Sequence, residues 1–303
     1  MNITFIGGGN MATAIIGGLL QRNWDAKHIR VVEIVATARD KLAQTYGVQT
    51  FASASAEALQ ADCVVLAIKP QQMREAAAQL APLISHALVI TIAAGIRGAD
   101  LSRWLGNHQR IVRVMPNTPA LVLAGISGLY AMPGVTETDR ASAANIMGAV
   151  GETVWVEFEA DIDAVTAVSG SGPAYVFYFI ESLIHAGVGM GLDENQARQL
   201  AIGTVVGAAA LAQRGPESPQ TLREKVTSQG GTTHAAHSRP YGAMGEAEQE
   251  DADSGAQGLG GGVIQGDGAG RERRHWAERL LQLVGRPADG AGEPGPDRVE
   301  RRW

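Results

Sequence analysis

Cysteine is nearly absent from this chain, whose 303 residues include only Cys63. A single thiol cannot form an internal disulfide, and such sparse cysteine use is typical of proteins in a reducing cytoplasm. The chain also lacks an excess of positive charge, since its formal net charge is −6. Proteins that bind nucleic acid or anionic lipid are usually basic, so this charge argues against both kinds of partner.

Long apolar runs are missing as well. The longest, such as "ALVITIAAGI" at residues 87–96, are too short to cross a bilayer. The first ten residues, "MNITFIGGGN", lack the basic segment and the apolar core of a secretory signal. His and Cys residues do not show the spacing of metal ligands. We therefore expect a cytoplasmic protein with no metal and no membrane or nucleic-acid partner.

The first half of the chain alternates short apolar runs with helical patterns. This alternation is typical of βαβ units and predicts an α/β domain whose mostly parallel sheet is covered on both faces. The expected strands are Ile3–Ile6, Ile29–Ile34, Cys63–Ile68, Leu88–Ile92, Ile111–Met115 and Thr153–Val156. The expected helices lie near residues 10–22, 39–47, 71–81, 99–105 and 137–149.

Residues 173–213 show two long helical patterns and no clear strand. The first, "PAYVFYFIESLIHAGVGMG", is apolar nearly all round, and a helix without a polar face must be buried on every side. A domain this small can hardly surround that helix by itself. We therefore expect the helix to be buried between subunits of a homodimer or larger oligomer.

The composition changes again from about residue 237, where Gly, Glu, Asp and Arg dominate and apolar periodicity is lost. Such a segment buries too little surface to offset the entropy cost of ordering it. Residues 237–303 are therefore predicted to form a poorly structured, aberrant tail. An abrupt change of this kind is what a shifted reading frame in GC-rich DNA would produce, and sequencing the source DNA would test it.

The stretch "FIGGGNMA" places Gly7-x-Gly9-x-x-Ala12 directly after an expected strand and at the start of an expected helix. This is the dinucleotide-binding pattern, with alanine in its third position. Gly7 permits the tight turn, Gly9 lets a pyrophosphate approach the backbone, and Ala12 allows close packing of helix on strand. The free N–H groups of the helix start, at Asn10 and Met11, would hold the phosphates.

Glu33 closes the second expected strand. A carboxylate at this place often accepts a hydrogen bond from the adenosine ribose of NAD and repels a 2′-phosphate. Arg39 follows and could instead pair with such a phosphate. A solvated glutamate at the end of a strand is equally consistent with the sequence.

Three further strands end in polar or small residues at the same expected edge of the sheet, where ligands bind in open α/β proteins. Lys69 follows Ala67 in "LAIKPQQM" and is interpreted as a contact to cofactor or substrate, with a plain surface lysine as the alternative. Ala94 lies in "ITIAAG". Asn117 and Thr118 lie between two prolines in "VMPNTPA" and form a polar turn that faces the expected nicotinamide site.

The order and spacing of several motifs resemble the pyrroline-5-carboxylate reductase family over roughly residues 1–236. The motifs that carry the resemblance are "FIGGGNMA", "AIKPQ", "AAG", "RVMPNTPA", "DAVTAVSGSGPAYVF", "GMGL" and "VTSQGGTT". "SGSGPAY" followed by "VTSxGGTT" is the most specific combination. The resemblance implies reduction of a cyclic imine acid to proline by hydride from NADPH, with NADH as the alternative cofactor.

The resemblance also implies the domain organisation. We expect a Rossmann-type, doubly wound dinucleotide-binding domain at residues 1–158. An all-helical dimerisation and substrate domain at residues 159–236 and the tail at residues 237–303 would follow. The expected partners are the imine acid and other copies of this chain.

The substrate loop implied by the resemblance is "VTSQGGTT", residues 226–233. A substrate carboxylate needs several N–H donors, which Gly230 and Gly231 would supply. Thr233 matches the family threonine that donates to the ring nitrogen, and Ser228 and Thr232 would help to hold the carboxylate. Glu159 matches an acidic residue near the substrate in the family, and a solvated glutamate is the alternative.

"SGSGPAY", residues 169–175, is expected to be a loop of little side-chain bulk before a buried helix. Pro173 suits the first turn of that helix, and Ser171 could cap it. The bare backbone would let the helix start approach the cofactor domain, whereas a plain turn between domains is the alternative.

Two other functions remain open from the sequence. A β-hydroxyacid-dehydrogenase-like oxidoreductase would share the fold, but no lysine lies between Pro173 and Gly191, where its catalytic lysine is expected. A dinucleotide-binding protein without activity would result if the altered tail removed helices that support the substrate loop. Binding of NADPH without turnover would indicate the latter.

Overall fold

The computed structural model describes residues 1–84 and 86–227, and these form two compact units. Within the described residues the first unit is Met1–Ala174 and the second is Tyr175–Thr227. The tail expected at residues 237–303 lies outside the described residues. None of the helices in the described part of the chain has both the length and the apolar character needed to cross a bilayer.

The first unit is built on an eight-stranded sheet with the order β3-β2-β1-β4-β5-β6-β7-β8. The strands from β3 to β6 pair in parallel, β7 pairs with β6 in the antiparallel sense, and β8 is parallel to β7. The strands are β1 (Ile3–Ile6), β2 (Ile29–Val32), β3 (Gln49–Phe51), β4 (Cys63–Leu66), β5 (Leu88–Thr91), β6 (Ile111–Met115), β7 (Gly125–Ala131) and β8 (Gly151–Trp155).

Helices connect these strands. They are α1 (Asn10–Gln21), α2 (Ala36–Tyr46), α3 (Pro70–Leu80), α4 (Gly98–Trp104), α5 (Glu137–Gly148) and α6 (Asp161–Val165). Two 3₁₀ turns lie at η1 (Ala26–His28) and η2 (Thr118–Val122), and a π-helical turn lies at η3 (Thr166–Gly170). The order of the six parallel strands and the helices between them make this a Rossmann-type, doubly wound domain, as expected.

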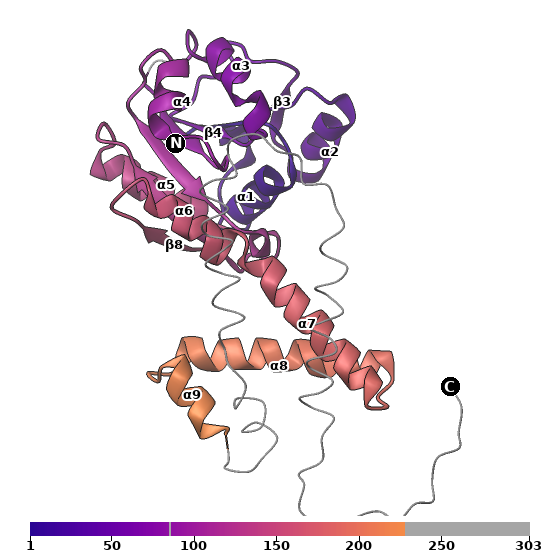
Figure 1. Cartoon of the computed structure of the whole chain (residues 1–303). Helices are drawn as coiled ribbons and strands as arrows, with labels where there is room; N and C mark the ends of the chain where they lie inside the picture. Colours follow the sequence, from indigo (N-terminus) through magenta and orange to yellow (C-terminus); the bar gives the residue numbers. More distant parts are fainter. Residues whose placement is uncertain (85, 228–303) are drawn as a thin grey trace, which may run out of the picture. The chain divides into compact units, whose positions relative to one another are not determined.

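Alternate residues of each central strand face opposite layers of helices. Cys63 and Val65 of β4 join the core formed with α1 and α5, whereas Val64 and Leu66 join the core formed with α3 and α4. This period of two is the geometry of an extended strand. Figure 1 shows α1 and α3 on opposite sides of the sheet. Because both faces are covered, the strands consist of apolar runs rather than of alternating polar and apolar residues.

Two strands were not expected from the sequence. β3 has only three residues, Gln49–Phe51, at the edge of the sheet, so its apolar signal is weak. β7 contains Gly125 and Gly128, and glycine is unfavourable in strands. Both strands are held by pairing with neighbours, β3 with β2 and β7 with β6 and β8, which a local pattern does not reveal.

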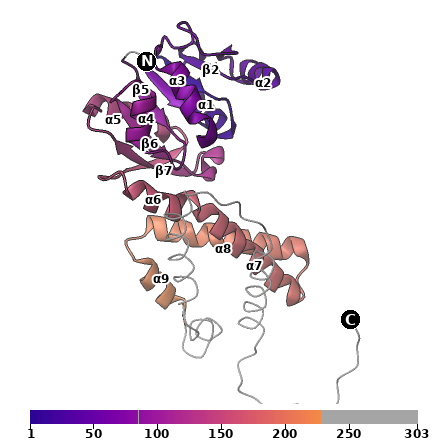
Figure 2. The same cartoon turned by 45° about the horizontal axis from the view of Figure 1, so that its top comes forward.

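The second unit is helical, in agreement with the expected change of character. It contains most of α7 (Gly172–Gly189), followed by α8 (Glu194–Arg214) and α9 (Pro219–Lys225). Figure 2 shows α7 and α8 as long helices joined by a tight turn. Gly187 of α7 packs on Ala197 of α8, since a Cβ built on Gly187 would lie 3.0 Å from the Ala197 Cβ. Asp193 caps α8 in a capping box with Gln196.

Candidate functional site

The predicted cofactor residues of the first unit follow five different parallel strands. Gly7 follows β1, Glu33 follows β2, Ala67 follows β4, Ala94 follows β5 and Asn117 follows β6. Parallel strands end at one edge of their sheet, so the fold brings all five segments to that edge. The order of the strands reverses beside β1, between β2 and β4, which is where open α/β sheets bind ligands.

Gly7 forms the turn between β1 and α1. Its φ is 95°, a left-handed conformation that glycine adopts without a Cβ penalty. A Cβ built on Gly7 would lie 2.6 Å from the carbonyl oxygen of Ala67. The Gly7 N–H also donates to the Val32 carbonyl over 2.8 Å. The turn is therefore fixed between the ends of β2 and β4, and only glycine fits there.

The start of α1 has free donors and no side-chain cap. Gly9 is the N-cap residue, no acidic residue lies in the first turn, and nothing lies within 4 Å of a Cβ built on Gly9. The first N–H groups of a helix, here at Asn10 and Met11, have no intrahelical acceptor. Ala12 is buried in the core beneath them. Uncapped donors and a positive dipole end above open space fit a dinucleotide pyrophosphate.

Glu33 is tied to the glycine turn. Its Oε2 accepts the N–H of Gly8 at 2.8 Å, and its Oε1 accepts the N–H of Val35 at 2.9 Å. Arg39 donates through Nη1 to the backbone carbonyls of Glu33 and Ile34, at 2.8 and 2.9 Å. The strand end therefore carries a fixed carboxylate beside a fixed guanidinium, so both groups that the sequence offered for the adenosine ribose lie at this place.

The other predicted cofactor residues differ in their exposure. Lys69 is the N-cap residue of α3 and is exposed, and Ala94 is also exposed. The side chain of Asn117 is buried, and its Oδ1 accepts the N–H of Ile126 at 3.0 Å. Asn117 therefore links the loop after β6 to the start of β7. Its contact with a nicotinamide stays a prediction.

Glu159 is not a solvated glutamate. Its Oε1 accepts from Nη1 of Arg113 at 2.7 Å and from the N–H of Gly98 at 2.5 Å. The Arg113 side chain is only 3% exposed and lies in β6, two residues before the "PNTPA" loop. Sequence reasoning missed Arg113, although a charged residue within the apolar strand "IVRVM" is a signal that it has a buried partner.

The segment expected to be a loop before α7 is helical instead. Residues Thr166–Gly170 form a π-helical turn that continues α6, and the Ser171 N–H donates to the Thr166 carbonyl at 2.8 Å. Ser171 itself has helical dihedral angles rather than the extended ones typical of an N-cap, so the predicted cap is not formed in that way. π-Helical turns occur frequently at functional sites.

The residues predicted to hold the substrate are described only in part. Ser228, Gly230, Gly231, Thr232 and Thr233 lie outside the described residues, and their roles stay predictions. Glu159 alone of this group is described, in the contacts given above.

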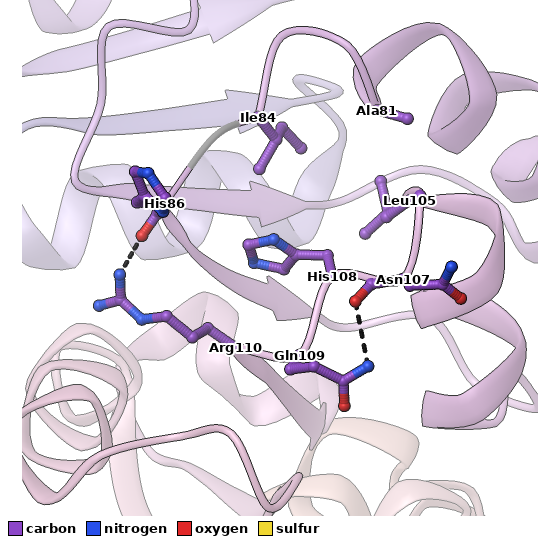
Figure 3. Close-up of a pocket in the computed structure, with 9 residues that line it drawn as sticks. Ala81, Ile84, His86, Leu105, Asn107, His108, Gln109 and Arg110 are labelled. Carbon is purple, nitrogen blue, oxygen red and sulfur yellow. Dashed lines mark hydrogen bonds between the residues drawn. The ribbon is translucent and has the colours of Figure 1, made fainter.

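A cavity of about 390 Å³ lies at the other edge of the sheet (Figure 3). Its lining residues precede β5 and β6, so it is far from the carboxyl ends of those strands. His108 lies in its wall, with Nε2 2.9 Å from the Ala87 carbonyl oxygen, and burial lowers the pKa of this histidine. Arg110 donates to the carbonyl of His86. None of the predicted site residues lines this cavity.

Comparison with known proteins matches two family models to this chain. Residues 2–95 match the family described as NADP oxidoreductase coenzyme F420-dependent. Residues 159–240 match the family described as pyrroline-5-carboxylate reductase dimerisation.

Individual proteins are also similar. The pyrroline-5-carboxylate reductase of Pseudomonas aeruginosa is 44% identical over 235 residues, which cover 77% of this chain and 86% of the relative. The structure of a pyrroline-5-carboxylate reductase from Coxiella burnetii has a TM-score of 0.73 at 37% identity and covers 94% of this chain and 96% of its own. The structure of Plasmodium falciparum pyrroline carboxylate reductase with NADP bound has a TM-score of 0.72 at 25% identity. The match covers 94% of this chain and 98% of that one.

Proposed function

Because the chain belongs to the pyrroline-5-carboxylate reductase family, we propose that it reduces 1-pyrroline-5-carboxylate to proline with NADPH as the hydride donor. The observation that carries this proposal is the uncapped start of α1, which fits the pyrophosphate at the sheet edge beside the other predicted cofactor residues. A relative whose structure contains NADP supports the choice of cofactor.

The described residues have distinct tasks in this reaction. NADPH supplies the hydride that adds to the C=N carbon of the imine acid. The N–H groups of Asn10 and Met11 bind its pyrophosphate, and Glu33 and Arg39 lie where its adenosine ribose is expected. Lys69, Ala94 and Asn117 lie along the edge toward β6, where the nicotinamide end is expected. These residues bind and orient the cofactor, and orientation is a large part of catalysis by hydride transfer.

The substrate is held by the segment after α9 in this proposal. Gly230 and Gly231 offer N–H donors to its carboxylate, with Ser228 and Thr232 beside them. Thr233 donates a hydrogen bond to the ring nitrogen, which gains electron density as the hydride arrives. This assignment rests on the match of these residues to the family motif.

We also propose that the active form is a homodimer or a larger oligomer in the cytoplasm. The second unit exposes large apolar side chains, with Phe177 62%, Val206 63% and Leu211 58% accessible. Exposed apolar surface of this kind is typical of a protein interface. The match of residues 159–240 to a dimerisation family supports self-association.

The test is a turnover assay with purified protein. We expect loss of NADPH absorbance and formation of proline when 1-pyrroline-5-carboxylate is added. A β-hydroxyacid with NADP⁺ in place of the imine acid and NADPH is the control for the alternative oxidoreductase, and it should form no NADPH. Binding of NADPH without turnover of the imine acid would contradict the proposal and indicate a dinucleotide-binding protein without activity. Light scattering of the same sample gives the number of subunits.

A further inference from the structure

Arg113 and Met115 lie two residues apart on β6, so their side chains point to the same face of the sheet. Met115 is the last residue of the strand and directly precedes the "PNTPA" loop. On the antiparallel neighbour β7, Gly128 lies opposite Met115. These three positions form one surface at the end of β6 that faces α6 and the π-helical turn.

Two close contacts join this surface to the helical segment. A Cβ built on Gly128 would lie 2.5 Å from a methyl carbon of Val165, the last residue of α6. A Cβ built on Gly170 would lie 2.6 Å from the Cε of Met115. The segment therefore lies directly on the sheet, with glycine at one side of each contact. Neither position has room for a larger residue unless its neighbour moves.

The third contact is ionic. Glu159 precedes α6 and accepts from buried Arg113 through the same oxygen that accepts the N–H of Gly98 at the start of α4. A buried guanidinium without a counter-charge is strongly unfavourable, so Arg113 holds Glu159 in place. One carboxylate thus joins β6, α4 and the segment that leads to α6.

We propose that Glu159 is a positioning residue, which fixes α6 and the π-helical turn on β6 through its ion pair with Arg113. The turn then places Gly170 against Met115, next to the loop of Asn117 where the nicotinamide is expected. A side chain at Gly170 of the "SGSG" segment would meet Met115, so glycine at this position lets the turn lie against the strand end. This inference rests on the proposed function for its catalytic readout only.

A substrate ligand at position 159 would behave differently. Replacing a carboxylate that binds the imine acid raises the KM for that substrate, even in the isosteric Gln variant. A positioning residue changes the alignment of the nicotinamide and lowers kcat, whereas binding of NADPH depends mainly on the distant glycine turn at β1. A raised KM would therefore indicate a substrate ligand, and a lowered kcat would indicate a positioning residue.

The experiment compares variants of the full-length chain. For Glu159→Ala we expect kcat to fall roughly tenfold to a hundredfold, as loss of alignment often causes, with the Kd for NADPH within about threefold of the wild type. Glu159→Gln keeps an acceptor for Arg113 and Gly98 and should recover part of kcat without a rise in the imine KM. A raised imine KM in Glu159→Gln, with kcat close to that of the wild type, would overturn the proposal.

Asp163→Ala is the matched control. Asp163 lies on α6 and pairs with Arg97 at 3.0 Å, but both side chains are about half exposed. Exposed ion pairs contribute little, so kcat should stay within about twofold. If Glu159→Ala and Asp163→Ala change kcat equally, the buried pair has no special role and the inference is wrong.

A second pair of variants tests the docking without changing any charge. Gly128→Ala pushes against stiff, β-branched Val165 and should lower kcat, and adding Val165→Ala should restore it. If the double variant is no better than Gly128→Ala, the docking of α6 does not set the rate and the inference is wrong. This pair decides the question if Glu159→Ala does not fold.

Hydrogen exchange separates this inference from the proposed function. The amides of residues 159–172 should exchange at least tenfold faster in Glu159→Ala than in Asp163→Ala, whether or not the protein reduces the imine acid. Equal exchange in the two variants would overturn the positioning role. Absence of turnover in the wild type, with faster exchange in Glu159→Ala, would instead contradict only the proposed function.

Discussion

Glu33 accepts a hydrogen bond from the backbone N–H of Gly8, with 2.8 Å between Glu33 Oε2 and Gly8 N. This contact joins the end of β2 to the turn that follows β1 and places a carboxylate beside the helix start that is expected to hold the pyrophosphate. The negative charge at this place opposes a 2′-phosphate on the adenosine ribose, whereas Arg39 nearby favours one.

Glu33→Gln should raise kcat/KM for NADPH relative to NADH. Gln keeps the shape and an acceptor oxygen for Gly8 but removes the charge. The electrostatic interaction of a unit charge near a phosphate is about 1 kcal/mol, so we expect a change of roughly three- to tenfold. Steady-state kinetics with both cofactors measure the ratio. Glu137→Gln, at an exposed position on α5, is the control, and an unchanged ratio in Glu33→Gln would contradict the role of Glu33.

Gly7→Ala and Gly9→Ala should separate folding from cofactor binding. At Gly7 the φ of 95° and the nearby Ala67 carbonyl oppose a Cβ, so we expect a loss of about 2–4 kcal/mol in unfolding free energy. At Gly9 a Cβ meets nothing within 4 Å, so stability should stay within about 0.5 kcal/mol while NADPH binding weakens. Urea unfolding and NADPH titration measure both. Full NADPH affinity in Gly9→Ala would show that the pyrophosphate does not approach this residue.

Thr233→Ala should lower kcat/KM by roughly tenfold to a thousandfold. The threonine is predicted to donate to the ring nitrogen, and loss of one polarising donor has effects of this size. Initial rates with varied imine acid measure it. Thr138→Ala, at an exposed position on α5, provides the same substitution away from the site. Near wild-type kinetics for Thr233→Ala would remove Thr233 from the mechanism.

Leu123→Asn should stabilise the protein. Leu123 is the C-cap residue after η2 and has a φ of 58°, a left-handed conformation that is unfavourable for leucine and easier for asparagine. Its side chain is 38% exposed, so little packing is lost, and we expect a gain of about 0.5–1 kcal/mol. Leu121→Asn, at an exposed residue of the same turn, is the control and should bring no gain. Lower stability of Leu123→Asn in urea unfolding would show that its side-chain contacts outweigh the strain.

Asp139→Asn should lower the free energy of unfolding at neutral pH. It should also make that free energy depend less on pH in the acid range. The Arg110 guanidinium donates to both carboxylate oxygens of Asp139, at 2.6 and 3.1 Å, and this holds the pKa of Asp139 below its ordinary value of 3.8. A lowered folded-state pKa contributes stability above the unfolded value, and that stability is lost as pH falls through the folded one.

At neutral pH, Asp139→Asn should lower the free energy of unfolding by about 1–3 kcal/mol, because a neutral amide replaces a buried carboxylate that accepts charged hydrogen bonds. Below about pH 4 the unfolding free energy of the wild type should approach that of the variant. Unfolding free energies measured across the acid range test this. Asp100→Asn, which breaks an exposed pair with Arg103, is the control and should change little. A constant difference between wild type and Asp139→Asn at all pH values would contradict the assignment.

Patterns of neighbouring residues determined much of the fold. The sequence predicted β1 and β6 with their observed bounds and placed α1, α3, α4 and α5 within one residue at each end. These elements were predictable because apolar periodicity and the Gly7-x-Gly9-x-x-Ala12 pattern depend on residues close together in the chain. The same signals also predicted the edge of the sheet at which the predicted cofactor residues lie, because the carboxyl ends of parallel strands all lie at one edge.

Contacts between distant residues were decided only by the tertiary structure. β3 and β7 form because neighbouring strands pair with them, although their own residues favour a strand weakly. The partner of Glu159 is Arg113, 46 positions away, and no local pattern indicates that a glutamate before α6 meets a guanidinium in β6. Gly170 is visible in the sequence, but the surface at Met115 that it lies against is created only when the strands assemble.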